Sequence, residues 1–256
     1  DTTTRVPSSA HGAVECEHSD NYPITHAIRN QHWKIVLFLL VKFPRLVSAI
    51  TTPSTGISFF HLVAHNFHVL TDVGENTNQL RRLMVQKIWS LALEHIGWDP
   101  SVLPVPMRTL RPTPPGSTEV ACLSEICVDE KSPLALRPDA LGYTPLHMAC
   151  CIGDTKFVCF ILDSYDGDEY GPTAKDTTKI GMISRSIIKF RAGNGRSAMH
   201  FAAQCKHEEV LTLLCGYIST AEEATLRSED GRLPLHLAVY HLDSMPMSPD
   251  IVARLG

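Results

Sequence analysis

One sequence pattern recurs along the chain. It constrains the fold more than any other feature, because repeats of this length stack and bury their apolar faces against one another. The clearest copy is GYTPLHMACCIGDTKFVCFIL, residues 142–162. Four segments share its frame: NYPITHAIRNQHWKIVLFLL from Asn21, GISFFHLVAHNFH from Gly56, GRSAMHFAAQCKHEEVLTLL from Gly195 and GRLPLHLAVY from Gly231. The positions aligned with Thr144 are Tyr22, Ser58, Ser197 and Leu233, at successive spacings of 36, 86, 53 and 36 residues. Two spacings are therefore equal, and the two longer ones indicate insertions.

Each copy is typical of a pair of short helices. A hydroxyl at Thr144 suits the N-cap of a first helix, and Pro145 suits its first turn, where no N–H partner is needed. Gly153 suits a left-handed end to that helix. The second half places Phe157 and Ile161 on one face, together with their apolar neighbours at helical spacing. One unit cannot bury this stripe alone, so we expect neighbouring units to cover it.

The pattern Gly, Thr-Pro-Leu-His, Ala two residues later and then Gly resembles the ankyrin repeat. The resemblance implies an all-α fold, an ankyrin-repeat solenoid of about five helix-turn-helix units with two long insertions. The first copy departs from the pattern, with Thr25 in place of the His and Gln31 in place of the second Gly. The second copy has Phe59-Phe60 in place of Pro-Leu, for which we expect local repacking. The fifth copy stops inside its second helix, so the array is expected to continue in a longer parent chain or to end imperfectly here.

The spacing predicts four regions along the chain. These are an N-terminal segment 1–19, repeats 1–2 in 20–95, an insertion or degenerate repeat in 96–139, and repeats 3–5 in 140–256 with an insertion at 163–190. A long helix is expected from about residue 80 to 95. Residues 97–119 contain six prolines and are expected to form an extended loop. Residues 120–139 are either the rest of that loop, which we favour, or a repeat that lost its motif.

The insertion at 163–190 contains two kinds of sequence. Its acidic start, DSYDGDEYG, is expected to be a surface loop. The following TKIGMISRSIIKF is compatible with a short strand pair or with a helix, and its pattern does not distinguish them.

Composition excludes several classes of partner. The net charge of -4 and pI near 6.4 leave no broad basic surface, so neither nucleic acid nor anionic membrane is expected as the main partner. The longest apolar run, residues 35–41, is far shorter than the roughly 20 residues that span a bilayer. Five of the eight cysteines fall within helical patterns rather than in a disulfide framework. Together with the lack of a visible signal peptide, this favours an intracellular, cytoplasmic protein with reduced thiols.

The motif histidines are His61, His147, His200 and His236. Counted from the sequence, they resemble a catalytic or metal-binding set. In the repeat frame each lies on its own unit, and packed helices are about 10 Å apart. One zinc with bonds of about 2 Å cannot join them. We therefore expect each histidine to form hydrogen bonds at the start of its own helix.

Other candidate sites also favour structural interpretations. Cys122 and Cys127 form half of a zinc motif that has no second half. The side chains of Cys205 and His207 are expected to point apart, which disfavours a nucleophile and its base. The acidic residues are Asp163, Asp166, Asp168 and Glu169, and they lack the spacing of a twelve-residue calcium loop. The segment GNGR, residues 193–196, lacks a phosphate-loop Lys and is expected to be a hairpin tip. We expect no metal, no cofactor and no enzymatic activity.

The resemblance implies that a protein partner binds the concave face, which hairpin tips and first helices form. Transferred unit by unit, the expected partner-binding residues are Asn21, Arg29, Asn30, Ile57, His65, Asn66, Tyr143, Cys151, Ile152, Arg196, Gln204, Cys205, Arg232, Tyr240 and His241. This predicts a scaffold or adaptor. One alternative is an array that packs in cis on another domain of a longer chain. Another is an enzyme whose site lies in residues 96–139, around Cys122 or Cys127, or outside this chain.

Overall fold

In the computed structural model, residues 22–51, 55–70, 73–98, 134–166, 182–217 and 227–240 are described. Within these ranges the chain forms helices joined by turns and loops, with no strand. The predicted all-helical class is therefore confirmed for this part of the chain.

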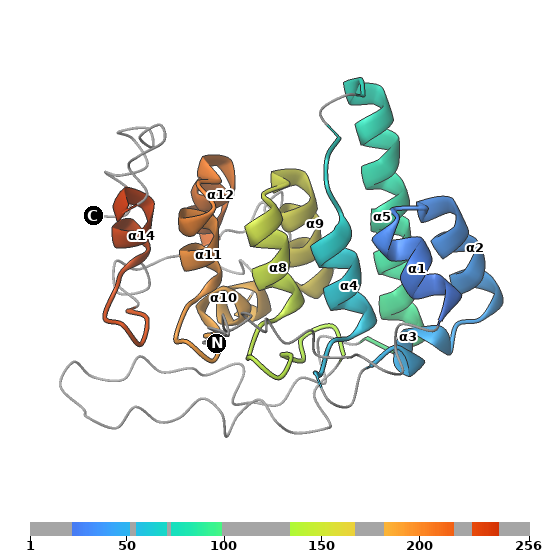
Figure 1. The fold of residues 1–256 in the computed structure, drawn as a ribbon, viewed down its shortest axis with the longest axis horizontal. Helices are drawn as coiled ribbons and strands as arrows, with labels where there is room; N and C mark the ends of the chain where they lie inside the picture. The colour runs from blue at the N-terminus through green and yellow to red at the C-terminus, as the bar shows by residue number, and fades with distance from the viewer. Residues whose placement is uncertain are drawn as a thin grey trace, which may run out of the picture.

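One helix from each copy of the pattern contributes to a first row of helices. The row consists of α1 (Pro23–Arg29), α4 (Phe59–Asn66), α8 (Pro145–Ile152), α11 (Ala198–Gln204) and α14 (Pro234–Tyr240). Each member contacts the next, although up to about eighty residues separate two neighbours in the sequence. Figure 1 shows these helices side by side, with α14 at one end and α1 at the other.

A second row of helices covers one side of the first row. It consists of α2 (Trp33–Lys42), α5 (Glu75–His95), α9 (Thr155–Asp166) and α12 (Glu208–Tyr217), again contacting one another in series. Each second-row helix also contacts the first-row helix that precedes it in the chain. Two further helices, α3 (Leu46–Ala49) and α10 (Met182–Lys189), lie between the pairs in the sequence.

The apolar core lies between the two rows, and its centre is aromatic. Trp89 of α5 is fully buried, and its ring centroid lies 4.9 Å from that of Phe60 and 5.8 Å from that of Phe157. Both contacts are edge-to-face, an arrangement that favours aromatic pairs. Phe60 replaces the motif Leu, so the expected repacking in the second copy takes the form of this aromatic cluster between α4, α5 and α9.

Three first-row helices, α1, α8 and α11, are followed by a residue with a left-handed backbone, whereas the aligned Phe67 after α4 has φ −81°. Gly153 has φ +88° at the end of α8, as predicted. The aligned residues Gln31 and Lys206 have φ values of 56° and 60° although neither is glycine. The departure of Gln31 from the motif therefore leaves the backbone conformation unchanged and adds local strain instead.

Two predicted boundaries were wrong. The long helix α5 begins at Glu75 rather than near residue 80, because buried Asn78 joins the helix to the preceding loop by accepting from Leu70 N and donating to Leu70 O. The acidic start of the insertion is not a surface loop at its first residues, since α9 continues to Asp166. Tyr165 and Asp166 are both buried, and the Tyr165 hydroxyl donates to Ala135 O at 2.8 Å.

The segment that the sequence left open between strands and a helix contains the helix α10. Ser184 attaches it to α9: its N–H donates to Asp166 Oδ1 at 3.1 Å, and its hydroxyl donates to Leu162 O at 2.9 Å. This second half of the insertion therefore packs on the helical rows. Residues 99–133, with Cys122, Cys127 and most of the proline-rich segment, lie outside the described residues, as do Asp168 and Glu169.

Candidate functional site

The loop before a first-row helix has the same backbone pattern in three copies. Ala192 N donates to Arg196 O at 2.9 Å, and Gly195 N donates to Ala192 O at 2.8 Å. The loops ending at Tyr143 and at Arg232 form the equivalent pairs of bonds. The segment GNGR is thus the tip of such a loop, as predicted.

Neighbouring loops are hydrogen-bonded to one another along the edge of the first row. Ala140 N donates to Thr55 O at 2.8 Å, Gly193 N to Leu141 O at 2.8 Å, and Glu229 N to Asn194 O at 3.2 Å. The loops therefore form one continuous border, below the first-row helices in Figure 1. A Cβ at Gly142 would overlap the backbone of Gly193, so glycine is required at this close approach.

Three motif histidines join each helix start to the following loop segment. His61, His147 and His200 each accept at Nδ1 from the N-cap backbone N–H, at 3.0–3.1 Å. Their Nε2 atoms contact the carbonyl oxygens of Tyr143, Phe190 and Arg232, at 2.8, 3.2 and 3.0 Å respectively. A backbone N–H can only donate and a carbonyl can only accept, so each imidazole is the neutral tautomer with its proton on Nε2.

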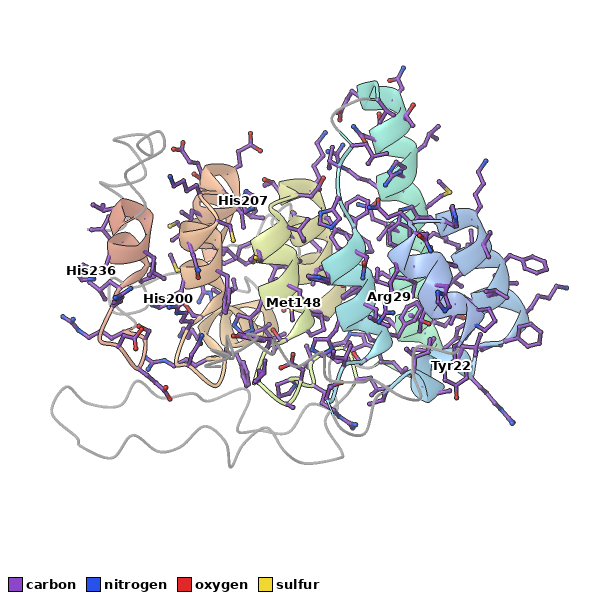
Figure 2. The ribbon with its side chains drawn as sticks, viewed as in Figure 1. Tyr22, Arg29, Met148, His200, His207 and His236 are labelled. Atoms are coloured by element: carbon purple, nitrogen blue, oxygen red, sulfur yellow. The ribbon has the colours of Figure 1, made fainter. Side chains whose placement is uncertain are left out.

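Burial keeps these rings neutral. It lowers the pKa of His147 to about 3 and that of His200 to about 4, and it also lowers the pKa of His61. His236 is exposed and accepts from Leu233 N at 2.9 Å. The predicted role of hydrogen-bonded helix-start residues is confirmed for all four, and Figure 2 shows His200 and His236 on neighbouring first-row helices.

Fourteen of the fifteen predicted partner-binding residues fall into three groups. Arg29, Asn30, His65, Cys151 and Gln204 are exposed; Ile57, Asn66, Tyr143, Ile152, Arg196, Cys205 and Arg232 are half-buried; and Asn21 and His241 lie outside the described residues. Tyr240 is in α14, where only its backbone is described.

Four of the exposed residues are equivalent positions on successive helices. Arg29 of α1, His65 of α4, Cys151 of α8 and Gln204 of α11 each lie seven residues after the position aligned with Thr144. Because these helices contact one another in series, the four side chains form a row across the first-row helices. We call these four residues the exposed row.

Sequence reasoning missed a second set of equivalent positions, one helical turn before the exposed row. Leu62, Met148 and Phe201 are half-buried apolar residues at this register, three residues before His65, Cys151 and Gln204. Residues three apart share a helix face, and this spacing could have identified them. Figure 2 shows Met148 on α8 and Arg29 on α1.

Some predicted binding residues contact other side chains or the backbone of the first row. The Tyr143 ring packs edge-to-face on Phe201 with centroids 5.4 Å apart, and Phe201 also contacts the His147 ring. Asn66 donates from Nδ2 to Leu62 O at 2.8 Å, and Arg196 donates to Gln204 Oε1 at 2.7 Å. Substitution of Tyr143 would therefore disturb the packing of two neighbouring units.

The described residues include no group of three or more His, Cys, Asp or Glu side chains placed to hold a metal ion. The Nε2 atom of His207 is directed at the carbonyl oxygen of Cys151, at 2.9 Å, rather than at the Cys205 thiol. Within the ranges that the structure describes, no helix is both long and apolar enough to cross a membrane.

The comparison with protein families supports the resemblance. The model of the ankyrin repeat family matches residues 141–176 and 194–221, which contain the third and fourth copies of the pattern. No curated protein matches the chain. The matched segments contain α8, α9, α11 and α12, with the bridging residues His147 and His200. The third and fourth copies of the pattern are therefore ankyrin repeats.

Proposed function

We propose that this chain is a non-catalytic scaffold or adaptor, a solenoid of five ankyrin units with two insertions that binds a protein partner on its first-row helices. Ankyrin repeats are generally protein-interaction modules. The observation that carries the proposal is the exposed row. A repeated backbone holds Arg29, His65, Cys151 and Gln204 at equivalent positions, so one surface offers a cation, an imidazole, a thiol and an amide in fixed order.

The half-buried apolar residues beside this row support the same proposal. Leu62, Met148 and Phe201 lie one turn away on adjoining helices. A partner that covers them would gain apolar burial at the centre of the interface, with the polar exposed row at its rim. The histidine bonds and the hydrogen-bonded loops fix the spacing of these positions, so little ordering entropy is lost on binding.

Site-specific photo-crosslinking tests the surface. A photoreactive phenylalanine analogue is placed at Gln204 of α11, and the matched control carries it at Thr212 of α12, which is also exposed but lies in the second row of the same unit. A protein partner cross-linked from position 204 and not from position 212 supports the proposal. Cross-linking from position 212 alone would place the partner on the opposite side and contradict it.

A second candidate function is packing in cis on another domain of a longer polypeptide. It is favoured by α2 and the residue that follows it, which expose Ile35, Phe38, Val41 and Phe43 at 51%, 60%, 57% and 58% of their surface. The same analogue at Phe38, in the natural polypeptide, distinguishes this candidate. An intramolecular product would favour cis packing, whereas a product only from position 204 would favour a separate partner.

We also propose an intracellular, cytoplasmic location. All five cysteines described by the structure are free thiols, as expected in a reducing compartment. Cell fractionation with an antibody to the chain tests this, and recovery in a secreted fraction would contradict it.

A further inference from the structure

Two cysteines from neighbouring units meet on the first-row helices. The Sγ atoms of Cys151 and Cys205 lie 3.1 Å apart, although 54 residues separate them in the sequence. Cys151 is in the last turn of α8, and Cys205 directly follows α11. Cys151 is exposed and Cys205 is half-buried, so a small solute can reach the pair.

The backbone fixes both positions without help from the sulfur contact. Cys205 ends α11, and its N–H donates to Phe201 O at 3.0 Å. The carbonyl oxygen of Cys151 accepts from His207 Nε2 at 2.9 Å, which joins the end of α8 to the residues just after Cys205. Gly153 leaves room for this contact, since a Cβ there would overlap the His207 ring. The two thiols are therefore held together by main-chain and side-chain bonds on either side.

The pair differs chemically from the other described cysteines. The hydrogen bond with the Cys205 thiol lowers the pKa of Cys151 to about 7, and the same bond raises the pKa of Cys205. Burial raises the pKa of Cys159 to about 11 and raises that of Cys150 further. Cys151 alone among these four is thus substantially a thiolate near neutral pH, and the thiolate is the reactive form of cysteine.

We propose that Cys151 and Cys205 form a reversible oxidation site that reacts with hydrogen peroxide and closes into a disulfide between α8 and α11. The Cys151 thiolate sulfur attacks one peroxide oxygen, the O–O bond breaks, and hydroxide leaves with Cys151 as a sulfenic acid. The Cys205 sulfur then attacks the Cys151 sulfur, the S–O bond breaks, and the Cys205 proton leaves with the oxygen as water. Two thiols and one hydrogen peroxide give one disulfide and two waters. This site goes beyond partner binding and does not depend on it.

The experiment oxidises the whole reduced chain with a small molar excess of hydrogen peroxide, blocks the remaining thiols with N-ethylmaleimide and maps tryptic peptides by mass spectrometry. The expected product joins peptide 197–206, which contains Cys205, to peptide 132–156, which contains Cys150 and Cys151. Dithiothreitol should separate the two peptides. The disulfide should also raise the Tm of the chain by several degrees, because it restrains a long segment of the unfolded chain.

Two variants make the assignment specific. Cys150→Ala leaves Cys151 as the only thiol in its peptide and should still form the product. Cys151→Ser, at an exposed position, should abolish it without loss of folding. A Cys205→Ser chain should instead accumulate a Cys151 sulfenic acid that dimedone traps.

The proposal would be overturned if N-ethylmaleimide, added after the peroxide, alkylates Cys151 and Cys205 completely, because both thiols would then have escaped oxidation. It would equally be overturned if they are recovered mainly in disulfides with other cysteines. In 8 M urea the selectivity for this pair should disappear, and an equal yield of the 151–205 product there would show that the fold does not direct the reaction.

Discussion

The imidazole of His200 connects two neighbouring units, since its Nε2–H donates to Arg232 O at 3.0 Å while its Nδ1 accepts from Ser197 N at 3.1 Å. One side chain thus fixes the start of its own helix and the end of the next loop. His61 repeats this arrangement with Ser58 and Tyr143. Coupling between units therefore depends on buried polar bonds as well as on the apolar core.

Replacement of a bridging histidine should cost more stability than replacement of an exposed one. His200→Ala removes bonds at both ring nitrogens and leaves the buried Ser197 N–H without its acceptor, so we expect a loss of about 3 kcal/mol in the free energy of unfolding. The matched variant His236→Ala removes one exposed bond, for which we expect less than about 1 kcal/mol. Urea unfolding followed by circular dichroism measures both. Equal losses would show that the bond to Arg232 contributes nothing.

Stability should fall as the pH drops below 6.5. The unfolded chain protonates its histidines near pH 6.5, whereas burial lowers the pKa of folded His147 and His200 to about 3 and about 4. The unfolded state therefore binds more protons in this window, and the stabilisation present above pH 6.5 is lost as the pH falls toward the folded values. Between pH 7 and pH 5.5 we expect these two residues together to lose about 2 to 3 kcal/mol. Urea unfolding at both pH values tests this, and a His147→Gln chain should show a smaller difference.

The left-handed helix ends should respond in opposite directions to substitution. Gly153→Ala places a Cβ at φ +88° and against the His207 ring, so we expect a loss of about 2 kcal/mol or more. Lys206→Gly relieves the same conformation at φ 60° and should raise the unfolding free energy by about 0.5–1 kcal/mol. Thermal unfolding of the two variants would contradict this account if Lys206→Gly is the more destabilised.

A partly buried ion pair should contribute more than an exposed one beside it. Arg82 Nε donates to Asp154 Oδ2 at 2.8 Å, and Asp154 also accepts from Phe157 N at the start of α9. Arg82→Ala leaves the Asp154 carboxylate, which is 3% exposed, without its cation, so we expect a loss of about 2 kcal/mol. Lys156→Ala removes an exposed contact with Glu75 at 3.4 Å and should leave the free energy of unfolding nearly unchanged, because solvent screens this pair.

A double-mutant cycle separates the pair from other effects of substitution. If Arg82→Ala costs the same in an Asp154→Asn background as in the native chain, the two residues are not coupled and the interpretation is wrong.

The sequence by itself determined the local structure of each repeat unit. The hydroxyl at the N-cap, the His three residues later and the apolar stripe of the second helix act within a few residues of one another, so Thr144, His147 and Phe157 could be placed from spacing alone. The family resemblance, transferred onto this frame, identified the exposed position of Gln204. Local sequence also predicted the left-handed end at Gly153.

Only the tertiary structure decided what crosses between units. No local spacing relates Cys151 to Cys205, Trp89 to Phe60 or the His200 ring to Arg232, because these contacts depend on how neighbouring units stack. The continuation of α9 to Asp166 was missed for the same reason: the polar residues of DSYD suggest solvent, but α10 covers them and Ser184 bonds the Asp166 carboxylate. A short-range pattern specifies helices through local hydrogen bonds, whereas burial is set by segments distant in the sequence, and it is burial that decided these contacts.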